Sequence, residues 1–108
     1  SEVESSFFKN VRLEVAKQNK HVPGCHNFDP SKSVFTHTNP QKLLTNFAGK
    51  GQAVGGRKIG YPDYREKVDF IEIIGYCKNQ SGELVPTSCG RIHYSKKGAH
   101  IIPTLPFE

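Results

Sequence analysis

Two histidines near the end of the chain, His93 and His100, lie in the segment Ile92-His-Tyr-Ser-Lys-Lys-Gly-Ala-His100. Imidazole titrates close to neutral pH, so a pair of histidines can supply one proton acceptor and one proton donor. RNA cleavage by the substrate's own 2′-hydroxyl needs such a pair, because one group takes the 2′ proton and another protonates the departing 5′ oxygen. The segment is therefore a candidate for acid–base chemistry on RNA.

The two histidines can act together only if they lie on one face of a β-hairpin. Residues 91–95 and 99–103 read as its strands, and side chains alternate between the faces of a strand. A loop of two residues (Lys97-Gly98) or four (95–98) places His93, Ser95 and His100 together, whereas a loop of three separates the histidines. We expect an even loop, because it sends an apolar set to the opposite face. That set is Ile92, Tyr94, Ala99 and Ile101.

Basic residues near this hairpin and in a glycine-rich loop at 49–60 are candidates for contacts with an RNA backbone. The loop lacks the G-x-x-x-x-G-K-[ST] order of a nucleotide-binding loop and no strand precedes it, so an RNA-binding loop and a simple flexible connection remain open. We expect substrate contacts from Arg91, Lys96, Lys97, Lys50, Arg57 and Lys58.

The other histidines are less informative by themselves. His21 follows Lys20 at the end of an expected helix, where a positive charge is favourable for structural reasons. His37 reads as an ordinary loop residue, whereas for His26, which follows Cys25, a ligand role stays open beside the favoured interpretation that it has no role. The acidic residues are scattered, whereas a two-metal nuclease would need clustered carboxylates. We therefore expect no metal and no cofactor.

The composition points to a polyanionic partner. Fifteen Lys and Arg oppose ten Asp and Glu, which gives a net charge of +5 and a pI near 9.2. Nucleic acid is the first candidate and an acidic protein the second, while a surface that is basic only for solubility is the plain alternative. The three cysteines lack C-x-x-C spacing, so neither a disulfide framework nor a cysteine zinc site is expected.

The length of 108 residues suits a single domain, residues 1–108. No apolar run approaches the ~20 residues that span a bilayer. The chain contains no Met, so we expect it to be the excised C-terminal part of a larger protein.

The pattern of elements predicts an α+β fold in which N-terminal helices precede a twisted antiparallel β-sheet. Residues 4–20 have the spacing of an amphipathic helix that buries Phe7, Phe8, Val11 and Val15. A second helix should begin after the cap Asn39, run over 40–48, bury Leu43, Leu44 and Phe47, and stop at Gly49. One long strand is expected over 67–77, then a turn at 79–82 and short strands at 84–85, 91–95 and 99–103.

Several of these segments resemble the polymorphic-toxin family called bacterial toxin 50, over about residues 19–103. They are Lys20-His21-x-Pro-Gly24, Tyr64-Arg-Glu-x-Val-Asp-Phe70, Ile74-Gly75, Pro86-Thr87 and, most specific, Ile92-His-Tyr-Ser-Lys-Lys-Gly-x-His-Ile-Ile-Pro103. Members form C-terminal warheads of large secreted proteins, including contact-dependent inhibition effectors. The resemblance implies a ribonuclease fold of the barnase, EndoU, colicin and RelE-like group.

The resemblance also implies roles for individual residues. His100 would be general acid or base, with His21 or His93 as its complement. Arg65 and Lys20 would hold phosphate, and Thr87 and Ser95 would donate hydrogen bonds to it. Glu66 is a further base candidate, although pairing with Arg65 or a nearby Lys suits it better.

Together these observations predict a metal-independent ribonuclease toxin that cuts tRNA in the cytoplasm of a competing bacterium. It would be delivered from the surface of the producer, be neutralised by an acidic immunity protein that covers the active face, and could require elongation factor Tu. The alternatives are a non-catalytic RNA- or protein-binding module and a metal-dependent DNase.

Overall fold

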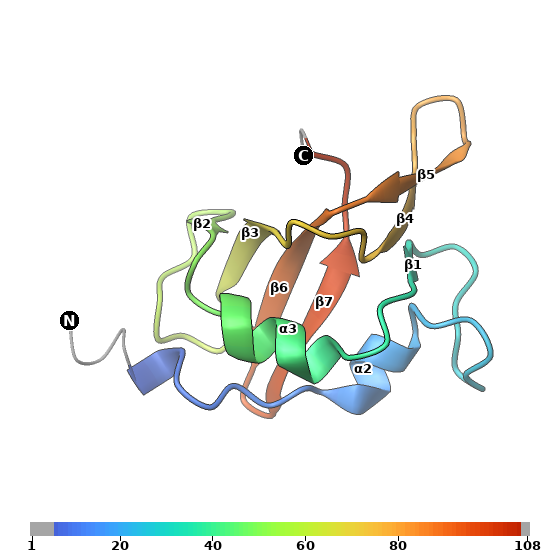
Figure 1. The fold of residues 1–108 in the computed structure, drawn as a ribbon. Helices are drawn as coiled ribbons and strands as arrows, with labels where there is room; N and C mark the ends of the chain where they lie inside the picture. Colours follow the sequence, from blue (N-terminus) through green and yellow to red (C-terminus); the bar gives the residue numbers. More distant parts are fainter. Residues whose placement is uncertain (1–5, 107–108) are drawn as a thin grey trace.

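A computed structural model describes residues 6–106 and shows an α+β fold, as expected (Figure 1). Within these residues, seven strands form two sheets, with the orders β2-β3-β6-β7 and β1-β4-β5, and every ladder in them is antiparallel. The larger sheet lies behind helix α3 in Figure 1. The helices are α2 (Val15–Asn19) and α3 (Pro40–Phe47), and the strands are β1 (Val34–Phe35), β2 (Gln52–Ala53), β3 (Arg65–Asp69), β4 (Gly75–Lys78), β5 (Leu84–Thr87), β6 (Cys89–Ser95) and β7 (Gly98–Pro103).

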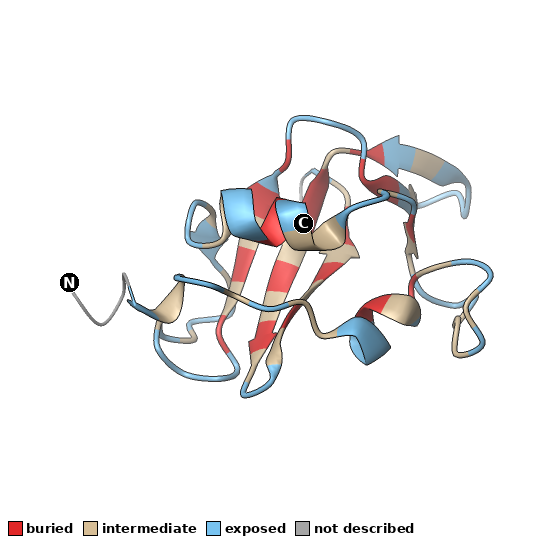
Figure 2. Ribbon diagram, turned by 60° about the horizontal axis from the view of Figure 1, so that its bottom comes forward, coloured by how far each residue is buried: buried red, intermediate tan, exposed pale blue. Residues whose placement is uncertain are grey.

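The β6–β7 hairpin confirms the even loop. His93 pairs directly with His100, and Ser95 pairs with Gly98, so the connecting loop is Lys96-Lys97. Buried and half-buried residues alternate strictly along β7 and from Gly90 onward along β6, which Figure 2 shows as stripes. The buried stripe joins the core cluster, which comprises Phe35, Leu43, Leu44, Tyr64, Val68, Phe70, Ile74, Ile92, Tyr94, Ala99 and Ile101. The sheet therefore has one packed face and one outer face that carries both histidines.

Helix α3 covers the packed face and has the predicted ends. The Asn39 side chain accepts a hydrogen bond from the Lys42 backbone N–H at 3.1 Å, and Pro40 occupies the first turn. Gly49 has a φ of 85°, the left-handed conformation that commonly follows a helix. Leu43 and Leu44 are buried as expected.

The single strand expected over 67–77 is wrong. The chain leaves the larger sheet after Asp69 and enters the smaller one at Gly75. Between them Ile71 has a φ of 73°, and its backbone N–H donates to the Asp69 side chain at 2.8 Å. This local turn ends the strand, which the β-branched residues after Asp69 would otherwise continue. The turn at 79–82 is confirmed, because the Gly82 N–H donates to the Asn79 carbonyl.

The helix expected over 4–20 is also wrong, although residues 4 and 5 lie outside the described part. Residues 6 and 7 are helical, Asn10 has a φ of 57°, and within residues 8–20 only Val15–Asn19 is helical. Residues 11–14, here called the edge segment, are instead extended along β7. Ala99 N–H donates to the Arg12 carbonyl at 2.8 Å, and Glu14 N–H donates to the Ala99 carbonyl at 2.7 Å. Backbone hydrogen bonds to the edge of β7 therefore hold this segment extended, although its side-chain spacing favours a helix.

Two further contacts fix the edge segment in place. The Gln41 side chain on α3 donates to the Val11 carbonyl and accepts from the Leu13 N–H, both at 2.8 Å. At the hairpin, a Cβ on Gly98 would lie 2.2 Å from the Arg12 carbonyl oxygen. Only glycine lets the segment approach this closely.

Candidate active site

The outer face of the hairpin brings two imidazoles together. His93 and His100 stand directly opposite each other on neighbouring strands, with ring centroids 5.5 Å apart. Both side chains are half-buried. Their Nε2 and Nδ1 atoms, respectively, are shielded from solvent and have no hydrogen-bond partner among the described residues. Two ring nitrogens are therefore uncommitted to the fold.

A third imidazole, that of His21, lies just after the end of α2 and close to His100. His21 is only 4% exposed, and its ring centroid lies 6.1 Å from that of His100. Its Nδ1 lies 2.9 Å from the Ser33 carbonyl oxygen, which can only accept. Nδ1 therefore carries the proton, and Nε2 is left as the basic nitrogen of the neutral ring. The structural contact of His21 with the Ser33 carbonyl therefore uses Nδ1 and not Nε2.

Gln18 holds α2 in this position. Its side-chain amide donates to the Ile101 carbonyl at 2.9 Å and accepts from the Ile101 N–H at 2.7 Å, so it occupies the edge of β7 as another strand would. The side chain is 1% exposed. Since Ile101 follows His100 and His21 lies one turn after Gln18, this clamp sets the distance between the two histidines. Nothing in the sequence pattern singles out Gln18, because glutamine is common on helix surfaces.

Lysines surround the histidines. An open pocket of about 460 Å³ is lined by the three imidazoles and by Lys17, Lys20, Lys32, Ser33 and Ile102. Lys20 was expected here, whereas Lys17, Lys32 and Ser33 were missed. Ser33 and Lys32 come from the loop that follows α2, so only the folded chain places them beside β7. The pocket combines proton-transfer groups with a positive environment suited to an anion.

Burial and nearby cations keep the imidazoles neutral. Burial, followed by the nearby Arg65 and His100, lowers the pKa of His93 to about 3. Burial and the neighbouring His21 lower the pKa of His100 to about 4, although the Glu14 carboxylate opposes this shift. Burial also lowers the pKa of His21, and its hydrogen bond to Ser33 opposes the effect. An anion bound among these groups would raise all three pKa values, because it favours the charged imidazolium.

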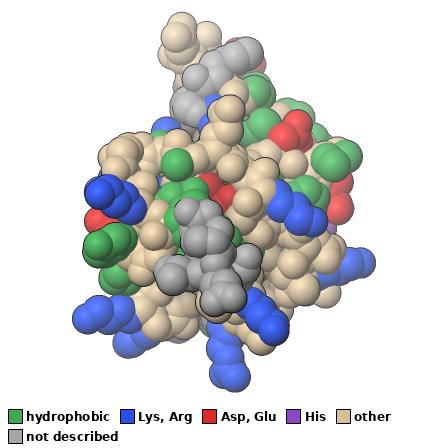
Figure 3. Space-filling model, turned by 90° about the vertical axis from the view of Figure 1, so that its left-hand side faces the viewer, with side chains coloured by type: hydrophobic (Ala, Val, Ile, Leu, Met, Phe, Trp, Pro, Cys, Tyr) green, Lys and Arg blue, Asp and Glu red, His purple; other side chains and the backbone are tan. Residues whose placement is uncertain are grey.

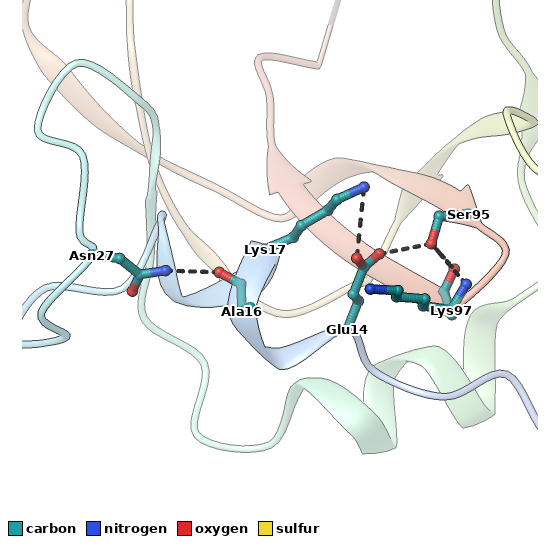
Figure 4. Close-up of polar contacts among 7 residues, drawn as sticks. Glu14, Ala16, Lys17, Asn27, Ser95 and Lys97 are labelled. Carbon is teal, nitrogen blue, oxygen red and sulfur yellow. Dashed lines mark hydrogen bonds and ion pairs between the residues drawn. The ribbon is translucent and has the colours of Figure 1, made fainter.

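Ser95 shares the outer face, but its hydroxyl is engaged at the hairpin end. It donates to Glu14 at 2.7 Å and accepts from the Lys97 N–H at 3.1 Å. Glu14 also pairs with Lys17 at 3.6 Å, so one carboxylate ties the start of α2 to the hairpin (Figure 4). These interactions orient the wall of the pocket that Lys17 forms.

The family model described as bacterial toxin 50 matches residues 13–103. The chain belongs to the bacterial toxin 50 family. No curated protein matches the chain. The matched range runs from the edge segment to the end of β7 and includes all three histidines of the pocket.

Two arginines of this toxin domain lie beside the pocket without lining it. Arg65 on β3 pairs directly with His93, and Arg91 precedes His93 by two residues on the same face of β6. Both side chains are half-buried. They contribute positive charge next to His93, which is one cause of its lowered pKa.

Thr87 lies elsewhere in the toxin domain. It is 3% exposed on β5, where its hydroxyl donates to the Thr104 carbonyl at 2.7 Å and accepts from the Cys89 N–H at 3.0 Å. These bonds join the smaller sheet to the segment after β7. The structure therefore does not bring Thr87 to the histidines.

The remaining basic candidates are spread over the surface. Lys96 and Lys97 are exposed at the hairpin turn, Arg57 pairs with Asp63 at 3.3 Å, and Lys50 lines a separate hollow with Lys67. Lys58 is exposed in the loop before β3. On the face seen in Figure 3, Lys and Arg side chains stand around the rim instead of forming one patch.

Glu66 lies on the packed face and not among the histidines. It is fully buried, accepts from the Gly49 and Gly51 N–H groups at 2.9 and 2.8 Å, and accepts from the Tyr94 hydroxyl. The expected pairing with Arg65 or a nearby Lys is wrong, because adjacent residues of a strand point to opposite faces. Glu66 instead holds the loop between α3 and β3.

Among residues 6–106, no group of three His, Cys, Asp or Glu residues has an arrangement that could hold a metal ion. All three cysteines are free thiols. Within the same residues, no helix has the length and apolar character needed to cross a membrane.

Proposed function

We propose that this toxin domain is a metal-independent endoribonuclease that cleaves RNA through attack of a 2′-hydroxyl on the adjacent phosphate. The observation that carries the proposal is the grouping of His21, His93 and His100 around one pocket lined by lysines. Two proton-transfer groups and several cations are the components that this reaction requires.

The surroundings of each imidazole suggest its role. Burial favours the neutral form of His21 by lowering its pKa, and the nearby Lys32 and Lys20 add to this effect. Because Nδ1 faces the Ser33 carbonyl, Nε2 is the nitrogen able to accept a proton. His21 is therefore assigned as the base that takes the 2′ proton. His100, whose ring centroid lies 6.1 Å from that of His21, is then assigned as the acid. Burial, His21 and Lys17 lower its pKa, and the Glu14 carboxylate offsets part of this shift. His93 lies beside His100 and would donate a hydrogen bond to a phosphate oxygen.

The reaction balances with these groups alone. His21 accepts the proton of the 2′-hydroxyl, the 2′ oxygen forms a bond to phosphorus, and the bond from phosphorus to the 5′ oxygen breaks. His100 gives its proton to that 5′ oxygen. The products are a 2′,3′-cyclic phosphate and a 5′-hydroxyl. Lys17, Lys20 and Lys32 stabilise the negative charge that gathers on the phosphoryl oxygens in the transition state.

Family membership and charge support the biological setting. A bacterial toxin must reach its target inside another cell, so delivery as the end of a larger secreted protein, with action in the target cytoplasm, fits this family. We propose tRNA as the substrate and an acidic immunity protein as the partner that protects the producer. The net charge of +5 favours both partners.

Purified domain incubated with total tRNA tests the activity. Cleavage is expected to persist in the presence of a chelator. The assay is run first without elongation factor Tu and then with it. His100→Ala should lower the rate by about 100-fold or more, the scale typical of a general acid. His26→Ala is the matched control, since His26 lies in a loop and does not line the pocket.

Two results would count against the proposal. The first is full activity of His100→Ala in a folded protein. The second is loss of wild-type activity with chelator and recovery with added metal, which would point to a metal-dependent nuclease instead.

A further inference from the structure

Arg65 and Arg91 form a second cationic group on the outer face, and the histidine pocket does not include them. Arg65 lies across from His93 on β3, and Arg91 lies next to it along β6. No carboxylate pairs with either guanidinium within residues 6–106. The Nε of Arg91 is shielded from solvent and has no hydrogen-bond partner there. Among residues 6–106, no carboxylate therefore neutralises these two half-buried guanidinium groups.

Two half-buried positive charges lower the stability of the folded protein unless a ligand neutralises them. Partly desolvated like charges repel each other, and an unmet buried donor loses its hydrogen bond to water. The neighbouring carboxylate on this face, Asp69, is turned toward the backbone and accepts from the Ile71 N–H at 2.8 Å. Within the described part of the chain the arginines therefore serve no ion pair, and an external anion is the partner that their chemistry fits.

Arg65 lies on the side of the histidines away from the lysines, and Arg91 lies beside His93 on β6. Arg65, His93 and His100 form one row across β3, β6 and β7. Neighbouring strands are about 4.8 Å apart, so the row spans about 10 Å between the outer backbones. The lysines of the pocket come from α2 and its following loop, beyond β7. A linear polyanion that runs along the row would meet the lysines, then the imidazoles, then Arg65, with Arg91 alongside.

We propose that Arg65 and Arg91 bind the phosphodiester next to the one that is cleaved, so that the ligand of this face is a single-stranded polynucleotide. The inference rests on the proposed function, which places the cleaved phosphate at the histidines. Guanidinium suits this role because its planar fork can bond two phosphate oxygens at once. A chain of phosphates fills both cationic groups together, whereas a single carboxylate of a protein partner fills only one. The domain should then cut within a strand and depend on phosphates beyond the scissile one.

Binding of uncleavable 2′-deoxy oligonucleotides to the full chain tests this directly. The probes are a nucleoside 3′-phosphate and otherwise matched oligonucleotides with two or three phosphates. For the unchanged protein, affinity should rise by about tenfold with the additional phosphates. In Arg65→Gln/Arg91→Gln this gain should disappear, while affinity for the one-phosphate probe stays within about twofold. The dependence of log affinity on log salt concentration should also flatten by about 0.7 for each phosphate that the variant no longer neutralises.

Lys42→Gln/Lys78→Gln is the matched control. It removes the same charge from α3, which covers the opposite face, and from β4 in the smaller sheet. This control should keep the gain. Thermal melting of each variant shows whether the fold is retained.

Three results would overturn the inference. They are a gain that survives in the arginine variant, an equal reduction in the lysine control, and a wild-type protein that binds no oligonucleotide, which would leave a protein as the ligand of this face. Failure of the proposed function is a separate result, because it is absence of RNA cleavage by the unchanged protein. Cleavage of RNA combined with an unaffected arginine variant rejects only the neighbouring-phosphate site.

Discussion

At the scale of single residues, the pocket depends on imidazoles that the fold keeps neutral. Burial lowers the pKa of His93 to about 3 and that of His100 to about 4. A neutral ring is a competent base, but an acid must first gain a proton. The free protein therefore holds its bases ready and its acid largely unprotonated at neutral pH. A bound phosphate would correct this, because its negative charge raises the pKa of each ring.

The pH dependence of the rate follows from these shifts. Because kcat/KM reports groups of the free protein and the pKa values of both His21 and His100 are lowered from 6.5, kcat/KM should be lower at pH 8 than at pH 5.5. The corresponding limb of kcat should lie at higher pH, since phosphate is then bound. Initial rates on a short RNA over pH 4–9 measure both. Identical limbs near pH 6.5 for the two parameters would show that the rings have ordinary pKa values.

The same shifts affect stability with a definite sign. The three histidines bind protons more weakly in the folded protein than in the unfolded chain, where the pKa is 6.5. The unfolded chain therefore takes up more protons between pH 6.5 and about 3, so the free energy of unfolding should fall as pH falls through this window. Urea titrations at several pH values measure it. His93→Gln should reduce the slope, and an unchanged slope would contradict burial as its cause.

At the scale of elements, local signals predicted the parts that local contacts control. The cap at Asn39, the glycine stop after α3, the turn at Asn79 and the parity of the hairpin were all predicted and are all present. The two errors, a helix over 4–20 and a strand over 67–77, have one kind of cause. In each case a contact that periodicity does not reveal, the β7 edge or the turn at Asp69, overrides the local preference.

Gln18 and Gln41 offer a matched test of how elements position the site. Each has a side-chain amide that makes two hydrogen bonds to an extended backbone, Gln18 to Ile101 and Gln41 to residues 11 and 13. Both changes to Met should lower the melting temperature, because each leaves two backbone groups without their partners. Only Gln18→Met should also lower kcat by about tenfold or more, since it frees α2 and moves His21 away from His100.

The comparison is made well below both melting temperatures, so that both variants are folded. Equal loss of kcat in the two variants would mean that Gln18 acts through stability alone. A shifted pH profile for Gln18→Met, with that of Gln41→Met unchanged, would support its role in positioning the imidazoles.

At the scale of the whole molecule, the site joins segments far apart in the chain. The sequence pattern placed His93 and His100 together, because a hairpin is a local structure. It could not assign Lys17 and Lys32 to the pocket, since their position depends on how α2 docks against β7. The family resemblance pointed to His21 and also to Thr87, and the structure brings only His21 to the pocket. Long-range docking is the part that spacing within one segment does not encode.

The chemistry of the RNA ends is the sharpest test of 2′-hydroxyl attack. RNA cut by the purified domain in the presence of a chelator can be sequenced after treatments that distinguish 2′,3′-cyclic phosphates from other termini. We expect a 2′,3′-cyclic phosphate and a 5′-hydroxyl at each new cut, and no cut where a single 2′-deoxy nucleotide replaces the attacking ribose. Fresh 5′-phosphate and 3′-hydroxyl ends, or cleavage that survives the deoxy substitution, would contradict 2′-hydroxyl attack and the roles assigned to the histidines.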